Sequence, residues 1–287
     1  MWAGIFRAMD LALIGLGGIG ASVGLAWRQA RQDGTCVGYD VVPDAVQGAL
    51  HTGAIDRPAA CVAECADAEL IVVATPPCAV PEVFQQLAPH LRSESVLTDV
   101  VSVKRPVLRW AEAYLSGFNR FVGGHPIAGT EHHGVHAARA DLFQGALWVL
   151  TPTAQTDSEA LQRVEAFVRR LHATPFVMDA LQHDREFALL SCVPHTLAFS
   201  LMAMHRENPT ALSGGGSWHS ATRVAQSDPT LWAQLLALNR EPTRMWLEQL
   251  TQRLQLLMEA LAGDDLDALQ RVLRCDSAGS SSDSANP

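Results

Sequence analysis

The residue best suited to acid–base chemistry is His125, which follows Gly123 and Gly124 at the end of an apolar segment and precedes Pro126. An imidazole titrates near neutral pH, so it can accept a hydroxyl proton while a hydride leaves the same carbon. Glycines let the backbone come close to other groups, and a proline cannot continue a strand's hydrogen bonding. We therefore expect His125 at the carboxyl end of a strand, where open α/β sheets bind ligands.

Three further polar residues could act on the same ligand. Ser102 follows the apolar segment 96–100 and is expected at the same sheet edge, although capping the next helix is an alternative role for it. Arg223 could hold a carboxylate through a bidentate ion pair. His195 follows Pro194 within the helical segment 181–205, where a proline should kink the helix and free a carbonyl; a purely structural kink is the alternative.

A glycine-rich segment supplies a second kind of site. Gly15-Leu16-Gly17-Gly18-Ile19-Gly20 follows the apolar run 11–14 and precedes helix formers at 21–31. In a strand–turn–helix unit the first glycine permits the tight turn, the second lets backbone amides approach a pyrophosphate, and the third lets the helix pack closely. The helix N-terminus adds a partial positive charge for the phosphates.

An acidic residue specifies the nucleotide. Asp40 ends the next apolar segment, 20 residues after Gly20, which is the spacing of a carboxylate that binds ribose hydroxyls. Such a carboxylate repels a 2′-phosphate, so NAD is expected over NADP; capping the turn before Pro43 is the alternative role. The expected cofactor-binding residues are Gly15, Gly17, Gly18, Ile19, Gly20, Asp40, Thr75 and Pro76.

The elements that position these residues change character along the chain. Apolar strand segments near residues 11–14, 35–39, 70–74, 96–100, 121–125, 147–150 and 174–178 alternate with helical segments, which predicts parallel β-α-β units. Residues 180–274 show helical periodicity alone. We expect an α/β protein: a Rossmann-type, doubly wound, mostly parallel sheet in a dinucleotide-binding domain (1–179), an all-helical substrate and dimerisation domain (180–274), and a disordered Ser-rich tail (275–287).

The charge and composition of the chain disfavour several kinds of partner. Thirty acidic and 21 basic residues give a net charge of −9 without a basic patch, which disfavours nucleic acid. No signal peptide and no run of about 18 uncharged apolar residues is expected, so we predict no membrane span. The scattered cysteines are typical of reduced thiols in the cytoplasm. His132 and His136 have helical spacing, but hydride transfer needs no metal, so no metal site is expected.

Several motifs together resemble the prephenate/arogenate (cyclohexadienyl) dehydrogenase family of tyrosine biosynthesis, over nearly the whole chain from residue 11 to about residue 239. The segments around His125 and Arg223 are far more specific than the glycine loop. The motifs that carry the resemblance are Gly15-x-Gly17-x-x-Gly20, Asp99-Val100-Val101-Ser102-Val103-Lys104, Gly124-His125-Pro126-Ile127-Ala128-Gly129-x-Glu131, Leu142-Phe143 and Thr222-Arg223-Val224-Ala225-x-Ser227-Asp228-Pro229-x-Leu231-Trp232.

The resemblance implies NAD-dependent oxidative decarboxylation of a cyclohexadienol, prephenate or arogenate, by a homodimer that joins through the helical domain. His125 and Ser102 would be catalytic. His125 would take the proton of the ring hydroxyl, and Ser102 would orient both His125 and that hydroxyl. The residues implied to contact the substrate or the pocket mouth are Arg223, His195, Glu131 and Trp232.

The sequence also departs from the family pattern. Cys192 replaces a common histidine before Pro194, and Ser220 stands where relatives often have an acid, so the choice between prephenate and arogenate stays open. One alternative is another two-domain NAD(P)-dependent dehydrogenase or reductase of small acids or imines. Such enzymes commonly use a lysine in the helical domain, and residues 180–287 contain none. The other alternative is a non-catalytic NAD-binding regulatory protein, which would not need His125, Ser102 and Arg223.

Overall fold

A single mixed sheet organises the first part of the chain. The computed structural model describes residues 10–30, 34–129, 134–212, 214–263 and 265–274. Within these residues an eight-stranded sheet has the order β3-β2-β1-β4-β5-β6-β7-β8. The strands are β1 (Leu11–Ile14), β2 (Cys36–Tyr39), β3 (Arg57–Pro58), β4 (Leu70–Val73), β5 (Val96–Asp99), β6 (Phe121–Pro126), β7 (Leu147–Thr151) and β8 (Thr174–Val177).

The strand directions confirm the doubly wound, mostly parallel fold. All neighbouring strands run parallel except β6 and β7, which are antiparallel and pair His125 with Val149. The central strands are buried on both faces, which explains why they are continuous apolar runs rather than alternating ones. The order reverses at β1 and β4, where open α/β sheets place their ligand crevice.

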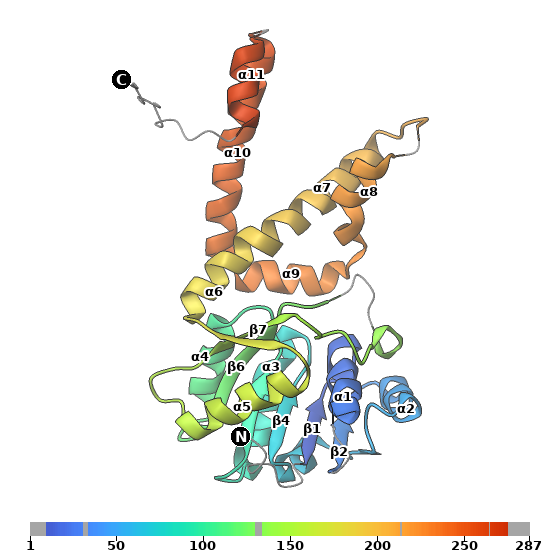
Figure 1. Cartoon of the computed structure of the whole chain (residues 1–287), viewed down its shortest axis with the longest axis vertical. Helices are drawn as coiled ribbons and strands as arrows, with labels where there is room; N and C mark the ends of the chain where they lie inside the picture. The colour runs from blue at the N-terminus through green and yellow to red at the C-terminus, as the bar shows by residue number, and fades with distance from the viewer. Residues whose placement is uncertain (1–9, 31–33, 130–133, 213, 264, 275–287) are drawn as a thin grey trace, which may run out of the picture.

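Helices cover both faces of the sheet (Figure 1). Trp27 of α1 and Phe167 of α5 pack with Leu13 in one core, whereas Phe84 of α3 packs with Ile14 in the other. The bounds are α1 (Gly18–Ala30), α2 (Pro43–Thr52), α3 (Val80–Leu87), α4 (Arg105–Tyr114) and α5 (Ser158–Arg170), with short 3-10 turns η1 (Val62–Asp67), η2 (Pro77–Ala79), η3 (Ala88–His90) and η4 (Val135–Ala137).

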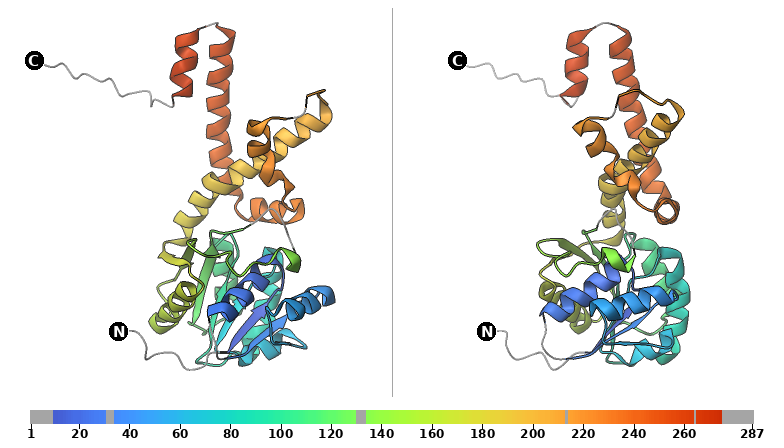
Figure 2. Two further views of the ribbon diagram at one scale, coloured as in Figure 1. Left: turned by 45° about the vertical axis from the view of Figure 1, so that its right-hand side comes forward. Right: turned by 90° about the vertical axis from the view of Figure 1, so that its right-hand side faces the viewer.

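The chain after β8 is helical. In Figure 1, α9 lies across the end of the sheet, and Figure 2 shows α10 and α11 projecting away as a helical hairpin. We propose that this change of architecture marks the boundary between domains 1–179 and 180–274; the tail 275–287 lies outside the described residues. The elements are α6 (Ala180–Phe187), η5 (Ala188–Cys192), α7 (Val193–Glu207), α8 (Gly216–Thr222), η6 (Arg223–Gln226), α9 (Pro229–Leu238), α10 (Arg240–Ala262) and α11 (Leu266–Leu273).

The helical segment that contains Pro194 is distorted rather than broken. The five residues of η5 form a π-helix between α6 and α7. A proline donates no backbone hydrogen bond, and a local widening of the helix accommodates it. The carbonyl of Ser191 accepts a hydrogen bond from the His195 ring (2.9 Å).

The same segment corrects one expectation from the sequence. The continuous helical run Ala180–Glu207 is long and apolar enough to cross a membrane by length and composition, and 22% of its most apolar stretch is buried. The prediction that no such run exists was therefore wrong, because the only ionisable side chains among residues 187–204 are those of His195 and Cys192.

Candidate active site

A cavity of about 1120 Å³ lies between the carboxyl ends of the strands and the helices of the second part. Both parts of the chain contribute to its wall, so it joins the dinucleotide loop to the helical residues. The sequence-predicted residues that line it are Gly15, Gly17, Gly18, Ile19, Asp40, Thr75, Pro76, Ser102, His125, His195, Arg223 and Trp232. Gly20 is buried beneath the loop, and Glu131 lies outside the described residues.

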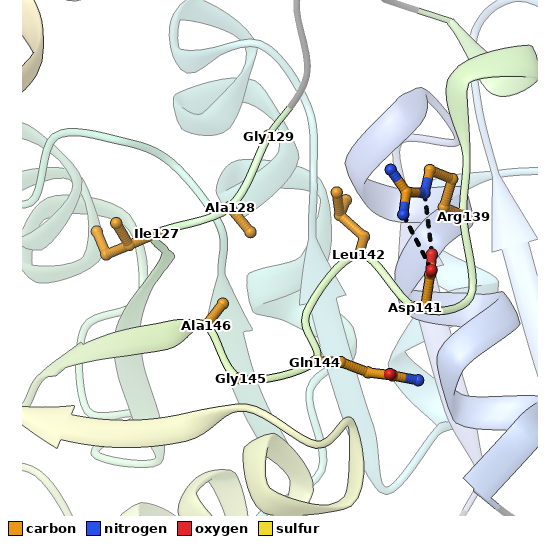
Figure 3. Close-up of a pocket in the computed structure, with 9 residues that line it drawn as sticks. All are labelled: Ile127, Ala128, Gly129, Arg139, Asp141, Leu142, Gln144, Gly145 and Ala146. Carbon is orange, nitrogen blue, oxygen red and sulfur yellow. Dashed lines mark hydrogen bonds and ion pairs between the residues drawn. The ribbon is translucent and has the colours of Figure 1, made fainter.

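A second, shallower cavity of about 420 Å³ lies beyond Ile127 (Figure 3). Its charged groups satisfy each other, because Arg139 forms two 2.9 Å hydrogen bonds to Asp141. None of the residues predicted for catalysis or binding lines it. The larger cavity is therefore the candidate active site.

The glycine loop has the shape that a pyrophosphate requires. Gly15 has φ 99°, and a Cβ on it would lie 2.5 Å from the Ala74 carbonyl oxygen. A Cβ on Gly20 would lie 2.0 Å from the Gly15 oxygen, so α1 packs against the loop only without a side chain there. A Cβ on Gly17 would meet nothing within 4 Å. Gly15 and Gly20 thus serve the packing, whereas Gly17 faces open space at the helix N-terminus.

Two polar side chains near the loop fit a dinucleotide. Asp40 Oδ2 accepts from the Leu16 amide (2.7 Å) and Oδ1 from the Val42 amide (2.9 Å). The carboxylate thus anchors the loop, and the remaining lone pair of each oxygen can accept a hydrogen bond from a ribose hydroxyl. Among the described residues the buried Thr75 hydroxyl has no hydrogen-bond partner, which is costly unless a ligand supplies one. Both observations fit a bound NAD.

His125 lines the cavity and is 7% exposed. Its Nδ1 is 2.9 Å from His183 Nε2, and His183 Nδ1 is 2.8 Å from Asp184 Oδ1. Burial, followed by the neighbouring His183 and Lys104, holds the pKa of His125 well below its ordinary value. The imidazole is therefore neutral at physiological pH and able to accept a proton.

A buried ion pair fixes the strand ends beside His125. Lys104 Nζ donates to Asp99 Oδ2 (2.5 Å) and to the Gly124 carbonyl oxygen. Asp99 also accepts from the amides of Gly124 (3.0 Å) and Val101 (2.9 Å). Burial lowers the pKa of Lys104, and Asp99 opposes that shift. These bonds tie the end of β5, which leads to Ser102, to the end of β6.

On the helical side, the His195 ring stacks on Trp232 with centroids 3.5 Å apart. Because a carbonyl only accepts, His195 Nδ1 must donate to Ser191, which leaves Nε2 as the acceptor when the ring is neutral. Burial lowers the pKa of His195; the bond to Ser191 opposes this, and Arg223 adds to it. Arg223 begins η6 and lines the same cavity.

The structure also places residues that the sequence analysis missed. Among the described residues the His125 ring is hydrogen-bonded to His183 and not to Ser102. His183 and Asp184 share a buried helix face with Ala180 and Phe187, and that helical spacing was the available signal. The orienting role of Ser102 stays a prediction.

Comparisons with known proteins agree with one another. Residues 23–176 match the family model of the prephenate dehydrogenase nucleotide-binding domain, and residues 179–275 match that of the prephenate dehydrogenase dimerization domain. Prephenate dehydrogenase of Bacillus subtilis is 32% identical over 80% of the chain, which spans 64% of that protein's length. Cyclohexadienyl dehydrogenase of Zymomonas mobilis is 32% identical over 90% of both chains.

A solved structure has the same architecture. Prephenate dehydrogenase from A. aeolicus, in complex with hydroxyphenyl propionate and NAD+, superposes with a TM-score of 0.87 at 29% identity. The match covers 94% of this chain and 96% of the other.

Proposed function

Because the chain belongs to the prephenate dehydrogenase family, we propose that it catalyses the NAD-dependent oxidative decarboxylation of prephenate, arogenate or both. The products would be 4-hydroxyphenylpyruvate and tyrosine, respectively. The observation that carries the proposal is a buried His125 in the wall of a cavity that the glycine loop and Arg223 also line.

NAD is the cofactor, and when bound it supplies the acceptor for a hydride. Gly17, Gly18 and the N-terminus of α1 would hold its phosphates, as the open space at Gly17 supports. Asp40 would accept hydrogen bonds from the ribose hydroxyls. Its negative charge would repel a 2′-phosphate, which favours NAD over NADP. Thr75 and Pro76 would line another part of the cofactor site, where the Thr75 hydroxyl, which has no partner among the described residues, could hydrogen-bond to the cofactor.

His125 would act as the general base. Its ring nitrogen on the cavity side takes the proton of the substrate's ring hydroxyl as hydride leaves the same carbon. Loss of the ring carboxylate as carbon dioxide then makes the ring aromatic, which drives the reaction forward. Ser102, in the same wall, would orient the hydroxyl.

The helical side would recognise the substrate. Arg223 can pair with a substrate carboxylate in a bidentate geometry. His195 and Trp232 form one stacked surface in the cavity wall, suited to the side chain and ring of the substrate. The assignment of Glu131 to the pocket mouth rests on the family resemblance.

We propose that the helical part joins two copies in a homodimer. Large apolar side chains are exposed along the projecting hairpin, and a second copy would cover them. They are Leu254, Leu256, Met258, Leu261, Leu266 and Leu273. The acidic net charge argues against nucleic acid as a partner. The free cysteines, Cys36 and Cys65 among them, fit a reducing cytoplasm.

The test supplies NAD with prephenate and with arogenate in separate reactions and follows the absorbance of the reduced cofactor. Reduction with at least one of them is expected. If NAD binds but neither substrate reduces it, the chain is a binding protein or acts on another substrate, and the proposed function fails.

A further inference from the structure

Two buried residues extend a line of hydrogen bonds from His125, and the first of them, His183, also lines the cavity. His183 is 3% exposed and Asp184 is 1% exposed, and both lie on α6 at the start of the helical part. His125 lies on β6 of the sheet. The line His125–His183–Asp184 therefore crosses from one part of the chain to the other, and its bonds are 2.9 and 2.8 Å long.

The hydrogen bonds of the Asp184 carboxylate determine which nitrogen atoms of the two histidines carry protons. Its Oδ1 accepts from the Lys104 amide (2.7 Å), and its Oδ2 accepts from the Arg105 amide (2.9 Å). These amides begin α4, whose N-terminus stabilises a negative charge. An ionised carboxylate can only accept, so His183 Nδ1 must carry the proton that lies between the two side chains.

The tautomer of His125 follows in turn. A neutral His183 with its proton on Nδ1 has a bare Nε2, which must accept from His125 Nδ1. His125 Nε2 is then left without a proton. The opposite arrangement requires a cationic His183. That cation would be a charge on a side chain only 3% exposed, beside His125 and with the Lys104 ammonium nearby, which is unfavourable.

We propose that His183 and Asp184 are positioning residues that fix His125 in the tautomer with a basic Nε2 and stabilise the ring once it is protonated. The inference rests on the proposed function, because His125 is the base only in that reaction. When His125 gains a proton at Nε2, its Nδ1–H becomes a stronger donor to His183, and Asp184 supports the charge through His183. No proton has to move along the line. The charged groups around it are Lys104 and Asp99, with the amide-bound Asp184 at its end.

The first test compares two substitutions of one residue. His183→Leu removes the acceptor for His125 Nδ1–H, whereas the side-chain oxygen of His183→Gln can still accept it. We expect kcat to fall by about 100-fold in His183→Leu, the size of a lost supporting hydrogen bond, with KM values within about twofold. His183→Gln should recover at least about tenfold of that loss. His90→Gln, an exposed site on η3, is the matched control.

The pH profile separates positioning from a packing defect. Both variants lack the imidazole whose charge lowers the pKa of His125, and only His183→Gln keeps the acceptor, so the acid limb of kcat/KM should lie at lower pH in His183→Leu than in His183→Gln. A packing defect would lower the rate equally at all pH values. An acid limb at the same or a higher pH in His183→Leu than in His183→Gln, or a kcat of His183→Leu within about threefold of wild type, would overturn the proposal.

The tautomer can be read without turnover. In ¹⁵N-histidine NMR of the full chain, His125 should show a protonated Nδ1 and an unprotonated Nε2, with the signal assigned by its loss in His125→Asn. The reverse tautomer contradicts the inference even if the enzyme is active. If the wild type reduces NAD with neither substrate, the proposed function fails, and the NMR result still decides the tautomer.

Discussion

The two sides of the cavity hold their chemical groups by different means. On the sheet side, backbone geometry fixes the site: Gly15 and Gly20 set the loop, and β6 ends at Pro126, directly after His125. On the helical side, side chains hold one another, as His195 does with Trp232. The sheet side therefore tolerates few backbone changes, whereas the helical side can be retuned by single side chains.

The largest effect is expected where the two sides meet, at His125. His125→Asn should lower kcat by about 10²–10⁴-fold, the range for loss of a general base, with a modest change in substrate affinity. Steady-state kinetics with saturating NAD measure both quantities. Turnover near that of wild type would remove His125 as the base.

The buried ion pair on the sheet side should carry much of the local stability. Lys104→Met leaves Asp99 buried without its cation, so the free energy of unfolding should fall by about 3–5 kcal/mol. Urea unfolding measures it. Arg244→Ala, which breaks an exposed pair with Glu241, is the control and should cost less than about 1 kcal/mol. Equal losses in the two variants would contradict this account.

On the helical side, Arg223→Ala should act on binding instead of folding. We expect the substrate KM to rise about 10- to 100-fold, because hydrogen bonds to charged groups contribute about 1.5–3 kcal/mol. The midpoint of thermal unfolding should change little. Arg253→Ala, at an exposed position of α10, is the matched control. An unchanged KM would place Arg223 outside the substrate site.

Two glycine substitutions in the same loop should have different effects, one on the stability of the fold and the other on NAD binding. Gly20→Ala should destabilise the fold by about 1–3 kcal/mol, because its Cβ would lie 2.0 Å from the Gly15 oxygen. Gly17→Ala should leave stability unchanged and weaken NAD binding about tenfold, since its methyl group would occupy open space near the phosphates. Calorimetry of unfolding and NAD titration measure the two effects. Equal affinity for NAD in Gly17→Ala and wild type would refute the loop assignment.

The smallest effect expected is on stability in mild acid. The pKa of His125 is lower in the folded chain than in the unfolded chain, so the unfolded state binds more protons as the pH falls. The free energy of unfolding should therefore decrease below about pH 6.5, and less steeply in His125→Asn. Urea unfolding across this range tests it, and identical slopes for the two proteins would contradict the prediction.

The sheet side was predictable because its signals are local. The glycine spacing and the apolar runs indicated the mostly parallel fold, which the structure confirms, and the match to a nucleotide-binding family model agrees with the expected dinucleotide cofactor. The antiparallel pairing of β6 with β7 and the short strand β3 carry no local signature. The role of each site residue and the domain boundary remain predictions.

The helical side was less predictable because its contacts are long-range. His183 reaches a partner 58 residues away, and Asp184 bonds to amides 79 and 80 residues away. Helical periodicity marks a residue as buried but does not identify its partner. His195 was identified from its neighbour Pro194, which is a local signal. Its stacking on Trp232 was not predicted, because the two residues are distant in the sequence.

The most direct test of the central claim is the stoichiometry of the reaction. The wild-type chain, given NAD and whichever of prephenate and arogenate it uses, should release one carbon dioxide for each cofactor reduced, and His125→Asn should lose both signals together. Cofactor reduction without carbon dioxide release would contradict the account, because the protein would then oxidise the substrate's hydroxyl without decarboxylating the ring.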